Sequence, residues 1–228
     1  MSAPPRPDSP GRIPPAQQTR ARVDGIVFDM DGTLIESHAV VPAAYRAAIV
    51  DRGGPALSDA EIIAGYSLGP PAAMLTHLMG RPATEADLAC YHDHLANLAE
   101  RVTVYPDMAE VLAELAARVP VGLFTGASHR AAEILLDRVG LLGHFRVVLG
   151  GDEAPRPKPF PDGVERACRL LGLKPRRAAY VGDSPLDLQA AWASGAVAVA
   201  AGWGHQYDAE EPADLTAGRP ADLRSLLD

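Results

Sequence analysis

The stretch VDGIVFDMDGTLIES, residues 23–37, joins a short apolar run to three acidic residues around Gly32, namely Asp29, Asp31 and Glu36. The apolar run is nearly continuous, as in a strand of a parallel sheet that is covered on both faces. Asp29 and Asp31 follow where this strand is expected to end. Two carboxylates in a crevice of low dielectric repel each other, and one becomes neutral unless a cation compensates. The stretch is therefore either an exposed turn or a charged site that binds a partner.

The rest of the chain decides the fold class. Strands are predicted at residues 120–125, 146–150, 178–182 and 196–200, and helices at residues 106–118, 128–140, 161–172, 184–195 and 220–228. Strands that alternate with helices of this length indicate an α/β fold with a doubly wound parallel sheet.

Residues 37–104 have a different pattern. Leu88, Tyr91 and Leu95 recur at helical spacing, and the segment contains no convincing strand. We predict an all-helical cap here, inserted into a core formed by residues 23–36 and 105–228. Residues 1–22 are rich in Pro, Arg, Gln and Ser and are predicted to be a disordered extension.

Composition excludes several classes of function. The net charge is −8 and aromatic residues make up 5% of the chain, which disfavours a nucleic-acid partner. No apolar run approaches the roughly 20 residues of a membrane span, and no signal-peptide core is present. We therefore expect a cytoplasmic protein without a membrane partner. The two cysteines, Cys90 and Cys168, lack metal-binding spacing and are interpreted as inert buried thiols.

Lysine is rare in this chain. Of 21 basic residues, only Lys158 and Lys174 are lysine, and the others are arginine. Lysine supplies a compact point charge that the planar guanidinium of arginine does not reproduce. Lys158, in the loop RPKPFPDG at residues 156–163, is therefore a candidate functional residue.

Polar residues follow the predicted strands at the edge where such sheets bind ligands. They are Asp29, Asp31, Thr125, Gly126, Lys158, Asp183 and Asp187. A set of acids, a hydroxyl and a lysine that converges from several strand ends is suited to phosphate chemistry.

The candidates divide into metal ligands and phosphate-binding groups. Asp29 and Asp183 offer hard oxygen ligands to Mg²⁺, which would neutralise them. Lys158 would offset the charge of the carboxylates and of a phosphoryl group. The Thr125 hydroxyl can donate to a phosphoryl oxygen, and the Gly126 amide can approach one closely.

Two of the acids suit covalent catalysis. Asp29 could attack phosphorus in line and form an aspartyl-phosphate. Asp31 could protonate the leaving oxygen and then activate water. Asp187 has two interpretations. It completes a capping box with Ser184 at a helix start, or it lies next to the metal ligands and orients them.

Four ordered segments support this interpretation: FDMDGTL at 28–34, LFTG at 123–126, KPFP at 158–161 and VGDSPLD at 181–187. They resemble the four motifs of the haloacid dehalogenase superfamily. The resemblance implies a Rossmann-like core, Mg²⁺ as cofactor and a helical cap of the C1 type. It makes Asp29 the nucleophile and Asp31 the general acid/base. It also assigns Thr125 and Lys158 to phosphate stabilisation and Asp183 to the metal, with the backbone carbonyl of Asp31 as a further ligand.

The segments YPDMAEVLAEL, LGPP and AGWGH resemble the phosphoglycolate phosphatases and their pyrophosphatase relatives. The resemblance implies a small phosphorylated metabolite as partner, with 2-phosphoglycolate as the first expectation and pyrophosphate as the second. A sugar phosphomutase of the same superfamily is an alternative, and a phospho-accepting signalling module is one from a different class. The cap arginines that could bind a small carboxylate are Arg46, Arg52, Arg81 and Arg101. The sequence does not indicate the oligomeric state.

Overall fold

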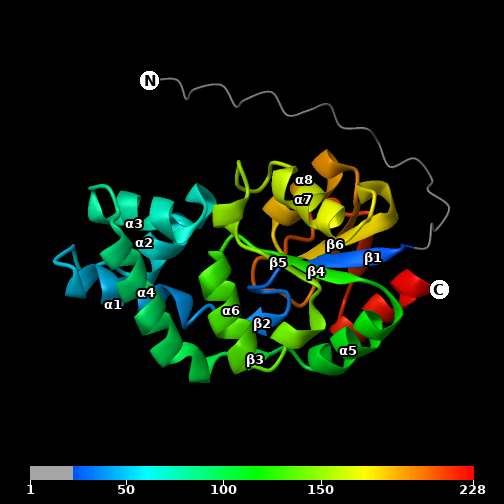
Figure 1. The fold of residues 1–228 in the computed structure, drawn as a ribbon, viewed down its shortest axis with the longest axis horizontal. Coiled ribbons are helices and arrows are strands. Elements are labelled where there is room, and N and C mark those ends of the chain that lie inside the picture. The colour runs from blue at the N-terminus through cyan, green and yellow to red at the C-terminus, as the bar shows by residue number, and fades with distance from the viewer. Residues whose placement is uncertain (1–22) are drawn as a thin grey trace.

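The computed structural model describes residues 23–228, and the extension expected at residues 1–22 lies outside them. Its main sheet contains six parallel strands in the order β5-β4-β1-β6-β7-β8 (Figure 1). The strands are β1 (Gly25–Phe28), β4 (Val121–Phe124), β5 (Val147–Leu149), β6 (Ala178–Gly182), β7 (Val197–Ala201) and β8 (Leu215–Ala217). The prediction of a doubly wound α/β fold is confirmed.

The strand order reverses at β1, which pairs with β4 on one side and with β6 on the other. The chain then continues outward through β5 on the first side and through β7 and β8 on the second. At such a reversal the loops beyond the carboxyl ends of the strands diverge and leave a crevice. This topology places the crevice directly beyond Phe28, where the acidic stretch begins.

Helices cover both faces of the sheet. Figure 1 shows α7 (Asp162–Leu170) and α8 (Pro185–Ser194) on one side, and α5 (Met108–Arg118) and α6 (His129–Arg138) on the other. Within β1, Ile26 and Phe28 belong to the buried cluster that contains residues of α5 and α6, whereas Val27 belongs to the cluster that contains residues of α7 and α8. Both faces of β1 are therefore buried, which explains why its sequence is continuously apolar.

Four α-helices, here called the cap helices, lie between β2 (Ile35–Glu36) and β3 (Thr103–Val104). They are α1 (Val41–Asp51), α2 (Asp59–Ala64), α3 (Pro71–Met79) and α4 (Glu85–Leu98), and Figure 1 shows them as a group beside the sheet. The strands β2 and β3 pair antiparallel, so the chain enters and leaves this group through neighbouring segments. The sequence did not predict this pairing, because two-residue strands are too short to show an alternating pattern.

The C-terminal part differs from the prediction in two places. The edge strand β8 was not predicted, since its two exposed residues and short length give no strand pattern. Residues 220–228 were predicted to be a helix, and Pro220–Leu227 forms a 3₁₀ helix instead. The buried residues Leu223, Leu226 and Leu227 of this 3₁₀ helix belong to the same hydrophobic cluster as the buried residues of α5.

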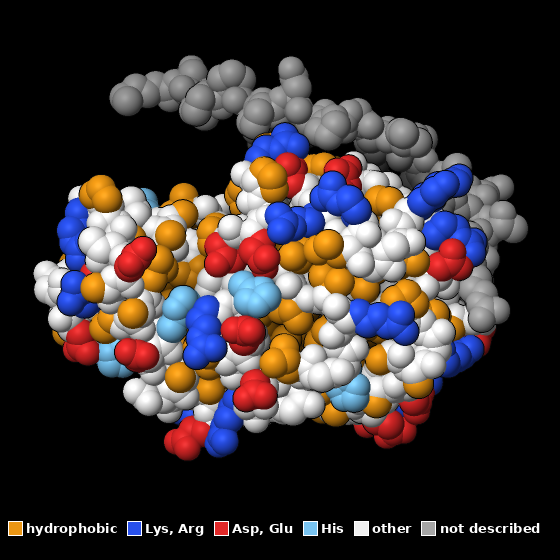
Figure 2. All heavy atoms as spheres, in the orientation of Figure 1, with side chains coloured by type: hydrophobic (Ala, Val, Ile, Leu, Met, Phe, Trp, Pro, Cys, Tyr) orange, Lys and Arg blue, Asp and Glu red, His pale blue; other side chains and the backbone are white. Residues whose placement is uncertain are grey.

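The described residues include no helix with both the length and the apolar character needed to cross a membrane. On the face drawn in Figure 2, Lys and Arg side chains are scattered among acidic ones and do not form a continuous basic strip.

Candidate active site

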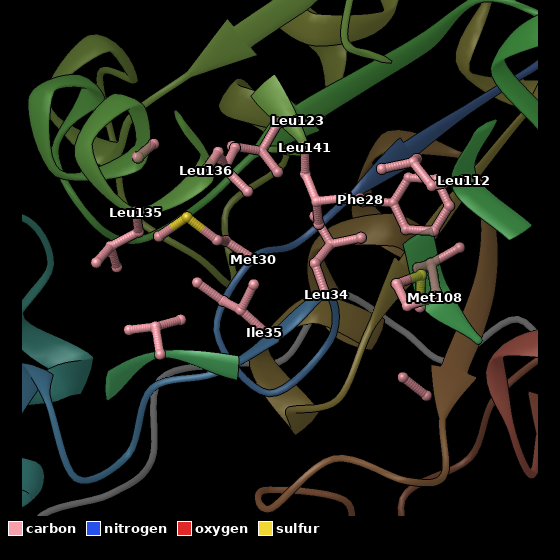
Figure 3. Close-up of a cluster of buried hydrophobic side chains, with 14 of the residues drawn as sticks. Phe28, Met30, Leu34, Ile35, Met108, Leu112, Leu123, Leu135, Leu136 and Leu141 are labelled. Carbon is pink, nitrogen blue, oxygen red and sulfur yellow. The ribbon is translucent and has the colours of Figure 1, made fainter. Parts of the chain in front are cut away.

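The loop after β1 is anchored by residues that point into the core. Met30 and Leu34 are fully buried, and Figure 3 shows both packed among other apolar side chains. The carbonyl of Met30 accepts hydrogen bonds from the amides of Leu34 and Ile35, at 2.9 and 3.2 Å. Asp29 and Asp31, which flank Met30, line a cavity instead. The alternation of apolar and acidic residues therefore fixes the acids at the cavity wall.

The seven site residues predicted from the sequence line one cavity of about 300 Å³. They are Asp29, Asp31, Thr125, Gly126, Lys158, Asp183 and Asp187. Six of them follow β1, β4 and β6 directly or lie in the loop after β5, and Asp187 lies in the first turn of α8. The crevice at the strand-order reversal therefore brings together side chains that are up to 158 positions apart in the sequence, from residue 29 to residue 187.

Lys158 links two of the carboxylates. Its Nζ donates to Oδ1 of Asp29 at 2.7 Å and to Oδ1 of Asp187 at 2.6 Å, and its side chain is 10% exposed. Burial acts to lower the pKa of Lys158, but the charges of Asp187 and Asp29 outweigh it and hold the pKa well above its usual value. The charged form of Lys158 is therefore favoured, and its two hydrogen bonds hold the ammonium group beside Asp29.

Asp187 combines a capping role with a contact in the site. Its Oδ2 accepts from the amide and the hydroxyl of Ser184, at 3.0 and 2.6 Å, which completes the capping box that begins α8. Its Oδ1 accepts from Lys158 and, at 3.1 Å, from the hydroxyl of Tyr180. The capping interpretation is thus confirmed, and the same carboxylate also positions the lysine.

Asp183 lies in a tight backbone cradle. Its side chain is buried between Gly32 and Gly204, and a Cβ on either glycine would lie 2.1 Å from an Asp183 atom. Its Oδ2 accepts from the amide of Gln206 at 2.9 Å, whereas its buried Oδ1 has no hydrogen-bond partner among the described residues. Burial, with a contribution from Asp187, raises the pKa of Asp183 to about 7.

The donor set fits a magnesium ion. Carboxylate oxygens of Asp29, Asp183 and Asp187 lie within 4.8 Å of one another. The carboxylate of Asp187 already accepts hydrogen bonds from Ser184, Lys158 and Tyr180. Asp29 and Asp183 are therefore the better candidate ligands. The unpartnered Oδ1 of Asp183 is a hard oxygen of the kind that Mg²⁺ binds.

Charge balance supports the same conclusion. Asp29, Asp31, Asp183 and Asp187 surround the cavity, and among its described lining residues Lys158 is the only lysine and arginine is absent. Burial raises the pKa of Asp29 well above its usual value, and the neighbouring carboxylates raise it further. A divalent cation would relieve this repulsion and favour the ionised form of Asp29.

The remaining predicted groups are placed for contacts with a ligand. Oδ1 of Asp31 accepts a hydrogen bond from the Ser37 hydroxyl, and burial raises the pKa of Asp31. Oγ1 of Thr125 accepts from the amide of Ala127 at 3.2 Å, so its own hydrogen can be donated into the cavity. A Cβ on Gly126 would meet no heavy atom within 4 Å, which leaves the backbone there accessible.

The cap side of the cavity contains residues that the sequence did not single out. Tyr45 and Tyr91 stack with ring centroids 4.2 Å apart and line the cavity beside His38. Tyr66 also lines it, and its hydroxyl is buried without a hydrogen-bond partner in the described chain. Tyr66 begins a 3₁₀ helix of only three residues, Tyr66–Leu68, so no periodic pattern in the sequence pointed to this hydroxyl.

The structure does not bring the four cap arginines, which are candidates for binding a small carboxylate, to the wall of the cavity. None of the four is among the described lining residues of the cavity, and three are paired elsewhere. Arg46 pairs with Asp59, and Arg52 and Arg81 both donate to the buried carboxylate of Asp87. Arg46 lies on α1 and pairs with Asp59 of α2, and Asp87 of α4 accepts from both Arg52 and Arg81, so these pairs link the cap helices to one another.

His205 and Gln206 line the cavity from the core side, in the loop after β7. Nδ1 of His205 lies 4.0 Å from Oδ2 of Asp183. The AGWGH segment at residues 201–205, identified only through its resemblance, was the available signal for this loop.

Comparisons with known proteins show which family the chain resembles. A family profile described as haloacid dehalogenase-like hydrolase matches residues 23–195. A phosphoglycolate phosphatase of Chromobacterium violaceum is 34% identical, over 90% of this chain and 96% of its own. A phosphoglycolate phosphatase of Pseudomonas putida is 30% identical, over 89% of this chain and 78% of its own. Among solved structures, the crystal structure of CbbY from Rhodobacter sphaeroides in complex with phosphate superimposes on this chain with a TM-score of 0.76. The two sequences are 23% identical, and the match covers 90% of this chain and 99% of the CbbY chain.

Proposed function

Because the chain belongs to the haloacid dehalogenase-like hydrolase family, we propose that it is a Mg²⁺-dependent phosphatase acting through an aspartyl-phosphate. The observation that carries this proposal is the placement of Asp29, Asp31 and Lys158 on one small cavity beside the unpartnered carboxylate oxygen of Asp183. The activity is that of a phosphoric monoester hydrolase.

In the first step, the carboxylate of Asp29 attacks phosphorus, and the bond from phosphorus to the leaving oxygen breaks. Asp31 donates its proton to that oxygen, a role supported by its raised pKa. In the second step, Asp31 takes a proton from water, the water oxygen attacks phosphorus, and inorganic phosphate leaves while the Asp29 carboxylate is restored.

Three further groups hold the phosphoryl oxygens during both steps. The Thr125 hydroxyl and the Gly126 amide donate hydrogen bonds, and the Lys158 ammonium offsets negative charge. Asp29 and Asp183 would hold the Mg²⁺ ion, with the backbone carbonyl of Asp31 as a third ligand. When bound, Mg²⁺ supplies positive charge that stabilises the transferring phosphoryl group.

The substrate is proposed to be a small phosphomonoester, with 2-phosphoglycolate as the first choice; the phosphoanhydride pyrophosphate is the second choice. A cavity of about 300 Å³ is at the lower end of the roughly 300–1,000 Å³ typical of small-molecule sites. The Tyr66 hydroxyl can donate a hydrogen bond to the substrate carboxylate, a role that the paired arginines do not fill. Two relatives at 30% identity or more are phosphoglycolate phosphatases, which supports the choice.

Hydrolysis of p-nitrophenyl phosphate is expected to require Mg²⁺ or a similar divalent ion. Without the ion, the carboxylates around Asp29 repel both one another and the incoming phosphate. The measurement is p-nitrophenol release by protein treated with a chelator, before and after Mg²⁺ is added. Full activity in excess chelator would contradict the metal assignment.

Among 2-phosphoglycolate, pyrophosphate, a hexose phosphate and a nucleotide, we expect the highest kcat/KM for 2-phosphoglycolate. Steady-state phosphate release measures this ranking. The same panel tests the sugar-phosphate and pyrophosphate alternatives. A hexose phosphate or a nucleotide with a kcat/KM about tenfold higher would overturn the substrate assignment.

The Tyr66→Phe variant tests whether the Tyr66 hydroxyl recognises the carboxylate of 2-phosphoglycolate. Removing a donor to a charged group is expected to lower kcat/KM for 2-phosphoglycolate roughly tenfold or more. Turnover of p-nitrophenyl phosphate, which has no carboxylate, should change little. Equal losses on both substrates would mean that Tyr66 does not recognise the carboxylate.

A further inference from the structure

A second group of metal-binding side chains lies in the cap helices, away from the phosphate site. Cys90 and His94 are one turn apart on α4, and Asp51 is the last residue of α1. One ligand atom from each residue lies within 4.8 Å of the other two, and Nε2 of His94 lies 2.7 Å from Oδ2 of Asp51. The sequence analysis interpreted Cys90 as an inert buried thiol, because the third member of the group comes from a helix 39 positions earlier, from residue 90 back to residue 51; in the structure Cys90 is only partly buried.

We propose that Asp51, Cys90 and His94 form a binding site for a transition-metal ion, with Zn²⁺ as the expected occupant. Thiolate, imidazole and carboxylate are the ligand types of zinc sites, at about 2.3, 2.0 and 2.1 Å from the metal. Such distances place the ligand atoms of a tetrahedral site about 3.3–3.6 Å apart, so small side-chain rotations suffice. The thiolate disfavours Mg²⁺ and Ca²⁺, which prefer oxygen ligands.

The helix geometry supports simultaneous binding by the two α4 residues. Side chains at positions i and i+4 lie on the same face of a helix, one turn apart. His92, two residues before His94, instead contacts Oγ of Ser128 through its Nε2 at 2.8 Å, so it faces a different part of the molecule. The pair that shares an ion is therefore Cys90 with His94.

The cluster is accessible to a metal ion from solvent. The side chain of Asp51 is 58% exposed and that of His94 is 28% exposed, while Cys90 is half-buried. Water can therefore reach the fourth coordination position. The adjacent Arg52 donates to Asp87 at 2.8 Å, so its charge is partly balanced within the cap. The Asp51 carboxylate instead contacts Nε2 of His94.

The cluster is separate from the phosphate cavity. Val41 and Tyr45, near the start of α1, line that cavity, whereas Asp51 ends the helix. Along the axis of this eleven-residue helix, Asp51 lies about 15 Å from Val41 and about 9 Å from Tyr45, and none of Asp51, Cys90 and His94 is among the described lining residues. A metal ion bound at the C-terminal end of α1 would join α1 to α4 and stabilise the cap without direct contact with the reacting groups.

The experiment is a Co²⁺ titration of the reduced full-length protein in saturating Mg²⁺, which keeps the phosphate site occupied. Thiolate bound to Co²⁺ gives a charge-transfer absorption that oxygen ligands do not give, so the signal reports Cys90 and not Asp29 or Asp183. We expect the band to saturate at one equivalent of Co²⁺ and to disappear when Zn²⁺ displaces it.

Two cysteine variants form a matched pair, because the chain has only two cysteines. Cys90→Ser is expected to lose the band and to keep its Mg²⁺-dependent turnover. Cys168→Ser, which changes a fully buried thiol in α7, is expected to keep the band. The variant His94→Gln retains the thiol and is expected to bind Co²⁺ at least ~10-fold more weakly. A wild-type protein without the band, or a band that survives Cys90→Ser, would overturn the proposal.

Discussion

Replacing Asp29 with asparagine is expected to lower kcat by at least ~10³-fold while the protein stays folded, because the amide cannot act as the nucleophile. The asparagine side chain would occupy nearly the same volume as the carboxylate, in a position where burial and three other acids already disfavour negative charge. Steady-state turnover of p-nitrophenyl phosphate in Mg²⁺ measures the loss, and circular dichroism with a thermal melt measures the fold.

The matched control is Asp24→Asn, at the start of the same chain segment. Asp24 pairs with Arg177 on the surface and does not line the cavity. Its turnover should therefore stay close to that of the unmodified protein. A folded Asp29→Asn variant with near-normal turnover would exclude Asp29 as the nucleophile.

The second large effect is expected for Lys158→Arg, which keeps the charge. Nζ of Lys158 lies 2.7 Å from Asp29 and 2.6 Å from Asp187, and also lies 5.6 and 5.8 Å from the ring centroids of Phe124 and Tyr180. A longer, planar guanidinium cannot occupy this enclosed position without displacing Asp29. We expect kcat to fall by ~10²-fold or more, as measured on the same substrate.

Lys174→Arg is the control for this variant, since Lys174 is the other lysine of the chain and is exposed. It should retain full activity and the same melting temperature. If Lys158→Arg were as active as Lys174→Arg, positive charge alone would be sufficient at residue 158.

The sheet and the predicted part of the site could be read from the sequence because they depend on local patterns and one topological rule. The alternation of apolar runs with amphipathic segments indicated the parallel strands. The rule that ligands bind beyond the carboxyl ends of these strands then grouped Asp29, Thr125, Lys158 and Asp183 from the sequence alone.

The features that the sequence did not show depend on contacts between distant segments. Arg52 was a candidate for substrate binding, and its actual partner is Asp87, on a different helix. The isolation of the Tyr66 hydroxyl is a property of the packed cap and not of the residue type. The closeness of Cys90 to Asp51 likewise requires the packing of α4 against α1. A single sequence contains no direct signal for such pairs.

The short β2–β3 pairing also has an evolutionary consequence. Because Ile35 pairs with Val104, the helical group begins and ends on two strands that are neighbours, about 4.8 Å apart. Any inserted segment whose two ends meet at that spacing could replace it without moving Asp29 or Asp183. Descendants of such a protein could therefore exchange the whole insert, or shorten it to a hairpin turn, and acquire a new substrate while they inherit the hydrolytic chemistry unchanged.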